Sequence, residues 1–137
     1  MKNEKMVQEW LRYAKSDADS ADFLYKNQMP RPLEIICFHC QQAAEKNLKA
    51  LLVGKNIPFD RKHDLVYLIE LNRTDDDGIS IPAELYLSCE RLTQHGISPR
   101  YPGGSEITEA DTKLALSDMD RINQWVKEEF ARMESQS

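Results

Sequence analysis

The sequence has little of what turn-rich, disordered or membrane-spanning proteins need. Its 137 residues include five glycines and six prolines, too few for a β-sandwich or a flexible linker. The longest apolar runs, residues 35–38 and 50–53, are far too short to cross a bilayer, and the charged N-terminus leads into no apolar stretch of signal-peptide length. We therefore expect a soluble, cytoplasmic protein without a membrane attachment.

Positive charge is also scarce. The 18 Lys and Arg residues are outnumbered by 23 Asp and Glu residues, which gives a net charge of −5. A surface that is positive throughout, as in a dedicated nucleic-acid coat protein, is excluded, so any site for a polyanion must be local. The 30% of charged residues suits long solvated helices and the 41% of hydrophobic residues suits one core, which predicts a single all-α domain over residues 1–137.

Cysteine is limited to Cys37, Cys40 and Cys89. An odd number without an export signal predicts reduced thiols that pack as small apolar side chains. Cys37, His39 and Cys40 are possible zinc ligands by type, but on one helix His39 points about 200° away from Cys37, and no fourth ligand is evident. We expect no metal site and no cofactor.

Apolar residues recur every three or four positions in five segments, as expected for amphipathic helices. Short connections make successive helices antiparallel neighbours, so the pattern predicts an up-and-down four-helix bundle with a short fifth helix. The second segment is the most apolar, so it is the best candidate for the centre of the bundle or for a subunit interface. The expected helices span 7–27, 32–54, about 65–69, 82–92 and, after a capping box at 108–111, a long final segment to about residue 133.

One carboxylate interrupts the apolar stripe of the first helix. Asp17 falls among Val7, Trp10, Ala14 and Ala21. A buried carboxylate needs a cationic or hydrogen-bonding partner, so a Lys, Arg, His or Tyr from another segment should contact Asp17. The alternative is that Asp17 lies at the edge of the stripe, in water.

A polar stripe follows the second helix. The stripe consists of His39, Gln42, Lys46 and Lys49, which share one arc of about 80° opposite the core stripe. Residues 46–63 hold five Lys and Arg residues against one Asp. This local positive charge suits a phosphate site, although a solvated helix face has the same pattern.

The loop after the fourth helix carries a second candidate. Pro99 and Pro102 flank Arg100 and Tyr101, so a stiff segment offers a planar cation, an aromatic face and a phenol. The pair either presents a ligand site or ties the loop to the bundle, for instance to Asp17.

Three segments together resemble the HEPN family, the higher-eukaryote and prokaryote nucleotide-binding domain. They are Cys-Phe-His-Cys-Gln-Gln-Ala-Ala-Glu-Lys-Asn-Leu-Lys-Ala-Leu-Leu at 37–52, Lys-His-Asp-Leu at 62–65 and Pro-Arg-Tyr-Pro at 99–102. The resemblance implies a bundle of four or five helices, frequent homodimerisation and, in bacteria and archaea, frequent pairing with a small nucleotidyltransferase.

Enzymatic branches of this family are metal-independent endoribonucleases that use an Arg and a His separated by four to six residues, brought together across a dimer. Here the nearest pair is Arg91 and His95, with three residues between them, and Gly96 follows. The pair would still share a helix face, but an ordinary Arg and His near a helix end also explains it.

Three functional hypotheses follow. The first is a non-catalytic module that binds nucleotide or phosphate and pairs with a small nucleotidyltransferase; its ligand residues are His39, Lys46, Lys49, Arg100 and Tyr101. The second is a ribonuclease toxin of a toxin–antitoxin pair that cleaves RNA with Arg91 and His95. The third is a purely structural interaction domain in which Asp17 and Arg100 brace the fold.

Overall fold

The computed structural model describes residues 3–73, 81–96 and 106–135, which form five helices and, within these ranges, no strand. Arg100 and Tyr101 lie outside the described residues. No helix in the described ranges is long and apolar enough to cross a membrane. The helices are α1 (Glu4–Asn27), α2 (Leu33–Gly54), α3 (Leu65–Arg73), α4 (Ala83–Thr93) and α5 (Glu109–Ser135).

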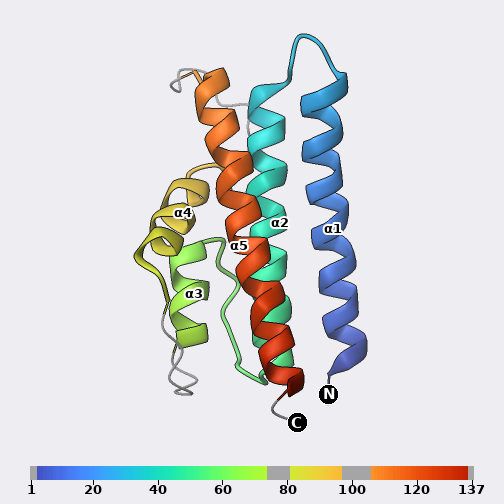
Figure 1. Cartoon of the computed structure of the whole chain (residues 1–137), viewed down its shortest axis with the longest axis vertical. Coiled ribbons are helices and arrows are strands. Elements are labelled where there is room, and N and C mark those ends of the chain that lie inside the picture. Colours follow the sequence, from blue (N-terminus) through green and yellow to red (C-terminus); the bar gives the residue numbers. More distant parts are fainter. Residues whose placement is uncertain (1–2, 74–80, 97–105, 136–137) are drawn as a thin grey trace.

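The helices are arranged around α2 (Figure 1). The long helix α1 packs along α2 in the opposite direction, α5 packs along another face of α2, and the short helices α3 and α4 lie on the side away from α1. The directions of α1, α2, α4 and α5 alternate, and α3 is the short extra element. This confirms the predicted all-α bundle.

Local signals explain where the helices begin and end. Thr108 and Asp111 form the predicted capping box at the start of α5: the Asp111 backbone N–H donates to Thr108 Oγ1 (3.1 Å), and the Thr108 N–H donates to Asp111 Oδ2 (3.0 Å). At the end of α2, Gly54 is still helical, and Asn56 adopts the left-handed conformation (φ 60°). Asn tolerates this conformation better than most residues and ends the helix.

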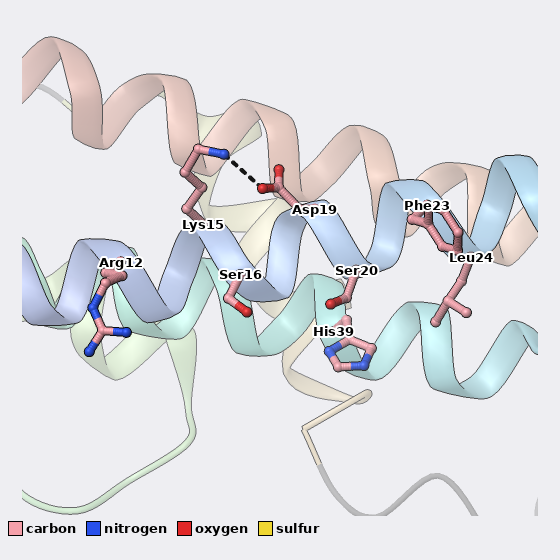
Figure 2. A pocket seen from close by; sticks show the side chains of 8 residues that line it. All are labelled: Arg12, Lys15, Ser16, Asp19, Ser20, Phe23, Leu24 and His39. Carbon is pink, nitrogen blue, oxygen red and sulfur yellow. Dashed lines mark hydrogen bonds and ion pairs between the residues drawn. The ribbon is translucent and has the colours of Figure 1, made fainter.

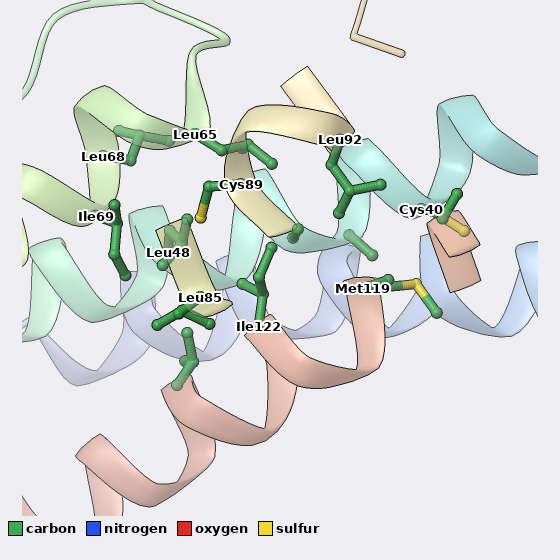
Figure 3. Packing of buried hydrophobic residues seen from close by; sticks show 14 of the residues in the cluster. Cys40, Leu48, Leu65, Leu68, Ile69, Leu85, Cys89, Leu92, Met119 and Ile122 are labelled. Carbon is green, nitrogen blue, oxygen red and sulfur yellow. The ribbon is translucent and has the colours of Figure 1, made fainter. Parts of the chain in front are cut away.

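The core draws on all five helices, and α2 supplies the largest share. Figure 3 shows buried side chains of α3, α4 and α5 that pack together with those of α2. Ile36, Leu48, Leu51 and Leu52 of α2 are fully buried. Leu65, Leu68 and Ile69 of α3, Leu85 and Leu92 of α4 and Ile122 of α5 pack against the same cluster. Burial on nearly all sides explains why the sequence of α2 is the most apolar.

Candidate functional site

A cleft of about 320 Å³ lies between α4 and the first half of α5. The last turn of α4 supplies Arg91, and the turn after it supplies His95. The facing wall comes from Leu114 and Asp118 of α5. The structure therefore places the Arg and the His of the ribonuclease hypothesis in one concave site, although the sequence spacing between them is short.

A buried carboxylate fixes the position of Arg91. Asp118 is fully buried, and Arg91 donates to it twice, from Nε to Oδ2 (2.9 Å) and from Nη2 to Oδ1 (2.7 Å). Ser88 Oγ donates to Asp118 Oδ1 (2.8 Å), and Arg121 Nη1 lies 3.2 Å from the same oxygen and 2.8 Å from Ser88 Oγ. We call these four residues the Asp118 cluster. Two-point pairing of this kind holds a guanidinium in one orientation.

The Asp118 cluster retains positive charge and free donors at its surface. Two guanidinium groups share one carboxylate, and their side chains remain 38% (Arg91) and 40% (Arg121) exposed. The bonds described above leave Nη1 of Arg91, and Nε and Nη2 of Arg121, without a protein acceptor among the described residues. Such exposed, oriented N–H groups suit the oxygens of a phosphate.

His95 is held where α4 ends. Its backbone N–H donates to Leu92 O (2.9 Å). A Cβ added to the next residue, Gly96, would lie 3.0 Å from Cδ of Gln41, so the chain passes close to α2 here. Burial lowers the pKa of His95, and the nearby carboxylates Asp111 and Asp118 only partly oppose this effect. The imidazole is therefore neutral at neutral pH.

The polar residues of α2 do not form the predicted solvated stripe. Asp17 of α1, whose side chain is 14% exposed, contacts both His39 Nδ1 (2.9 Å from Oδ1) and Lys46 Nζ (2.5 Å from Oδ2). The partner expected for Asp17 thus comes from α2. We call Asp17, His39 and Lys46 the Asp17 cluster.

The predicted position of Lys49 on an exposed polar face is wrong. We expected it opposite the core, but it is only 7% exposed because α1 and the segment after α2 cover this face. Its Nζ donates to Glu45 Oε2 (2.9 Å) and lies 5.7 Å from the ring centroids of both Trp10 and Phe59. Both lysines of the predicted phosphate site are therefore committed to carboxylates.

Glu45 of α2 is buried and organises a second network, in which the side chain of His63 is largely exposed. Glu45 Oε1 receives bonds from Gln41 Nε2 (3.0 Å) and contacts His63 Nδ1 (2.8 Å), while Lys49 binds Oε2. We call Gln41, Glu45, Lys49 and His63 the Glu45 cluster. Burial alone would raise the pKa of Glu45, but the bonds from Gln41, Lys49 and His63 outweigh it and lower the pKa.

The surface beside His39 is wide and shallow. It has a volume of about 600 Å³ and extends over the outer face of α1. Figure 2 shows His39 next to Ser20, while Lys15 and Asp19, which also line this surface, pair with each other (2.7 Å). Of the predicted ligand residues that the structure describes, only His39 lines this surface, so these residues do not converge on one pocket.

The three cysteines are buried. Burial raises the pKa of all three thiols, to about 12 for Cys89. Cys37 lies 3.6 Å from the Thr112 hydroxyl, and the described part of the chain contains no group of three or more side chains suited to a metal.

Sequence reasoning missed the centre of the Asp118 cluster. The signal was present, because Asp118 lies among Ala115, Met119 and Ile122 on the apolar stripe of α5, just as Asp17 lies on that of α1. Its partners come from α4 and from one turn further along α5, so only the packing of the two helices reveals them.

Comparisons with known proteins identify the family. Residues 7–129 match the HEPN domain. The fold is similar to that of ST0689, an archaeal HEPN homologue (26% identity, TM-score 0.71), over 90% of this chain and 96% of that one. It is also similar to that of TT1696 from Thermus thermophilus (23% identity, TM-score 0.71), over 89% of this chain and 96% of that one. No curated protein sequence matches. With the helical bundle and the family match over most of its length, the chain belongs to the HEPN domain family.

Proposed function

We propose that this protein is a non-catalytic HEPN module that binds a nucleotide or another small phosphate compound in the α4–α5 cleft. The observation that carries the proposal is the Asp118 cluster, in which Arg91 and Arg121 share one buried carboxylate and keep exposed donors. Arg91 and Asp118 line the cleft; Arg121 is not a lining residue and adjoins the cleft through Asp118. The proposal keeps the predicted function but changes the site, because Lys46 and Lys49 are committed to Asp17 and Glu45. Arg100 and Tyr101, outside the described residues, stay candidate ligand residues.

The test is a calorimetric titration with AMP, ADP and ATP. We expect Arg121→Gln to weaken binding about tenfold, because a charge-assisted hydrogen bond to phosphate is lost. Arg12→Gln is the matched control, since it removes the same charge from an exposed position on α1. Binding should also weaken as salt increases. No binding at millimolar nucleotide, or an equal effect of the two substitutions, would contradict the proposal.

A metal-independent endoribonuclease, the toxin of a toxin–antitoxin pair, is the second candidate. The observation in its favour is that His95, neutral because burial lowers its pKa, lines the same cleft as Arg91. His95 would take the proton of an RNA 2′-hydroxyl, the 2′-oxygen would attack phosphorus, and the bond to the 5′-oxygen would break, with the leaving oxygen protonated by water. Arg91 would stabilise the charge on the phosphoryl oxygens.

The charges in the cleft favour the first candidate. Two further carboxylates, Glu106 and Asp111, line the cleft in which His95 lies. Every further phosphate of an RNA strand that enters the cleft meets these carboxylates, whereas a small ligand can place its phosphate at Arg91 and beside Arg121, which lies outside the cleft lining. Incubation of purified protein with total RNA, beside His95→Ala, distinguishes the candidates: intact RNA in both samples eliminates the nuclease.

We also propose that the α4–α5 face is covered by a second protein chain. Leu114 lines the cleft and is 43% exposed, and Leu87, one turn before Arg91 on α4, is 50% exposed. The family resemblance suggests two occupants, a second copy in a homodimer or a small nucleotidyltransferase. Light scattering of the purified protein and of Leu87→Glu tests the homodimer, and a monomeric mass for the wild type contradicts it. The second occupant is then tested by a pull-down with the nucleotidyltransferase encoded by a neighbouring gene.

A further inference from the structure

A second concave site lies at the opposite side of the bundle from the α4–α5 cleft. It is a crevice of about 350 Å³ where the first half of α1 and the second half of α5 both flank α2. These two helices pack along α2 but contact each other little. In Figure 1, the N-terminal end of α1 and the C-terminal end of α5 lie at the same end of the bundle.

Two side-chain amides from different helices meet in this crevice. Asn47 of α2 donates from Nδ2 to Asn123 Oδ1 of α5 (2.7 Å), and both residues are half-buried and line the crevice. A carboxamide offers two N–H donors and an oxygen with two lone pairs. Their mutual bond therefore leaves an acceptor oxygen on Asn47 and two donor hydrogens on Asn123, next to each other.

The hydrogen-bonding atoms that the two amides do not use for each other are accessible from the crevice. Neither amide is among the buried polar groups that lack a partner. Exposed amides of this kind bind water, which a ligand with a matching polar edge can replace.

Part of the wall beside the amides is apolar, and the rest, including Gln8, is polar or charged. Val7 and Leu11 of α1 face Val126 and Phe130 of α5 across the crevice. Val7 and Val126 are buried, while Leu11 and Phe130 are partly accessible. An apolar wall next to a few convergent polar groups is the usual form of a small-molecule site.

The cation of this crevice differs in type from that of the proposed phosphate site. Its lining includes two carboxylates, Glu4 and Glu134, and one ammonium group, Lys127. No guanidinium lies among the described lining residues, so nothing here matches the oriented donors that Arg91 offers a phosphate, and the polar recognition proposed here comes from the neutral amides.

We propose that the crevice between α1, α2 and α5 is a binding site for a neutral planar compound of the carboxamide or lactam class. The N–H of the ligand donates to Asn47 Oδ1, its carbonyl oxygen accepts from Asn123 Nδ2, and its apolar body packs between Leu11 and Phe130. This site is independent of the phosphate site and needs no residue of the Asp118 cluster.

The experiment uses benzamide as the probe and the side-chain amide signals of Asn47 and Asn123 in NMR spectra as the readout. Benzoate has the same size with a negative charge, and toluene has the ring without the amide. We expect benzamide to shift both amide signals and to bind at least about fivefold more tightly than benzoate or toluene, which is the effect of one neutral hydrogen bond.

The decisive variant is Asn47→Leu/Asn123→Leu. Because both partners of the amide pair become apolar together, no buried polar group is left unpaired and the protein should still fold. We expect it to lose benzamide affinity about tenfold or more and to prefer toluene. Gln124→Leu is the matched control, since Gln124 is exposed and bonds to Glu128 outside the crevice. The proposal is overturned if benzamide binds no better than toluene, if the double variant binds benzamide as the wild type does, or if only signals near Arg91 respond.

Discussion

Buried carboxylates organise both sides of the bundle, but the number of cations bound to each carboxylate differs between the two sides. On the α1–α2 side, the lysines of α2 are each matched by a carboxylate: Lys46 by Asp17 and Lys49 by Glu45. On the α4–α5 side, one carboxylate, Asp118, binds both Arg91 and Arg121. In the first arrangement each lysine has its own carboxylate, and in the second the Asp118 cluster holds one more cation than carboxylate.

Exposure follows the same division. The side chain of Lys49 is 8% exposed and that of Lys46 is 25% exposed, whereas both guanidinium groups of the Asp118 cluster are about two-fifths exposed. A matched, covered ion pair stabilises one packing arrangement of the helices, and an exposed surplus cation remains able to bind an anion. The number of cations in a segment therefore says less about a binding site than the number of carboxylates that they meet.

The strongest test of this division is Glu45→Ala, which should cost about 3–5 kcal/mol of unfolding free energy. The substitution leaves the ammonium group of Lys49 buried without its carboxylate. Urea denaturation measures the loss. Nucleotide binding by the folded fraction should not change, because the Glu45 cluster does not line the α4–α5 cleft.

A matched variant separates the lost charge pair from the lost side chain. Glu45→Met/Lys49→Met replaces both partners with apolar groups of similar size, and we expect it to regain most of the stability. A loss below about 1 kcal/mol for Glu45→Ala would show that Lys49 reaches water easily and is not committed to the α1–α2 side.

Asp118→Ala should lower the unfolding free energy by about 2–3 kcal/mol, less than Glu45→Ala does, although Asp118 itself is fully buried. Its two arginine partners can turn toward water, because both are partly exposed, so the penalty for the unpaired charges is reduced. Thermal denaturation gives the stability, and the same samples give nucleotide affinity. We expect affinity to fall because Arg91 is no longer held in one orientation. A stability loss without any change in affinity would separate the Asp118 cluster from ligand binding.

Asp17→Ala tests the Asp17 cluster, which is more exposed than the Glu45 pair with Lys49, and should lower the unfolding free energy by about 1–2 kcal/mol. The carboxylate is largely buried, but Lys46 and His39 remain about a quarter exposed and can be hydrated when it is removed. Urea denaturation measures the effect, and Asp19→Ala, which breaks an exposed pair with Lys15, is the control with little expected change. Equal losses for the two variants would show that the Asp17 cluster is an ordinary surface pair.

Much of this fold is predictable because its signals are local. The capping box at Thr108 and the three-and-four spacing of apolar residues depend on neighbours along the chain, and both are confirmed. The need of Asp17 for a partner also followed from its place on an apolar stripe. The same reasoning applied to Asp118 would have predicted a buried carboxylate on α5.

The composition of the candidate site was not predictable in this way. A helix pattern separates apolar from polar faces, but it does not say which polar face another segment covers. Lys49 lies on the polar arc of α2 and is buried because Trp10 and Phe59 cover it from outside that helix. Arg91 meets Asp118 only because α4 packs on α5, 27 residues later in the chain. Pairing between helices decides whether a cation is structural or available, and it leaves no periodic signal.

The smallest expected effect is the pH dependence that His95 contributes on the α4–α5 side. Burial lowers the pKa of the folded-state imidazole below the ordinary value near 6.5, so the unfolded chain binds this proton more readily. The contribution of His95 to stability is complete above about pH 6.5 to 7 and is lost as the pH falls toward the lower folded-state pKa. We expect the unfolding free energy of the wild type to fall between pH 7.5 and 5.5 by a fraction of a kcal/mol more than that of His95→Gln. Urea denaturation of both proteins at matched pH values measures this difference, and parallel curves would mean that His95 is hydrated in the cleft and is not the neutral base that the ribonuclease candidate requires.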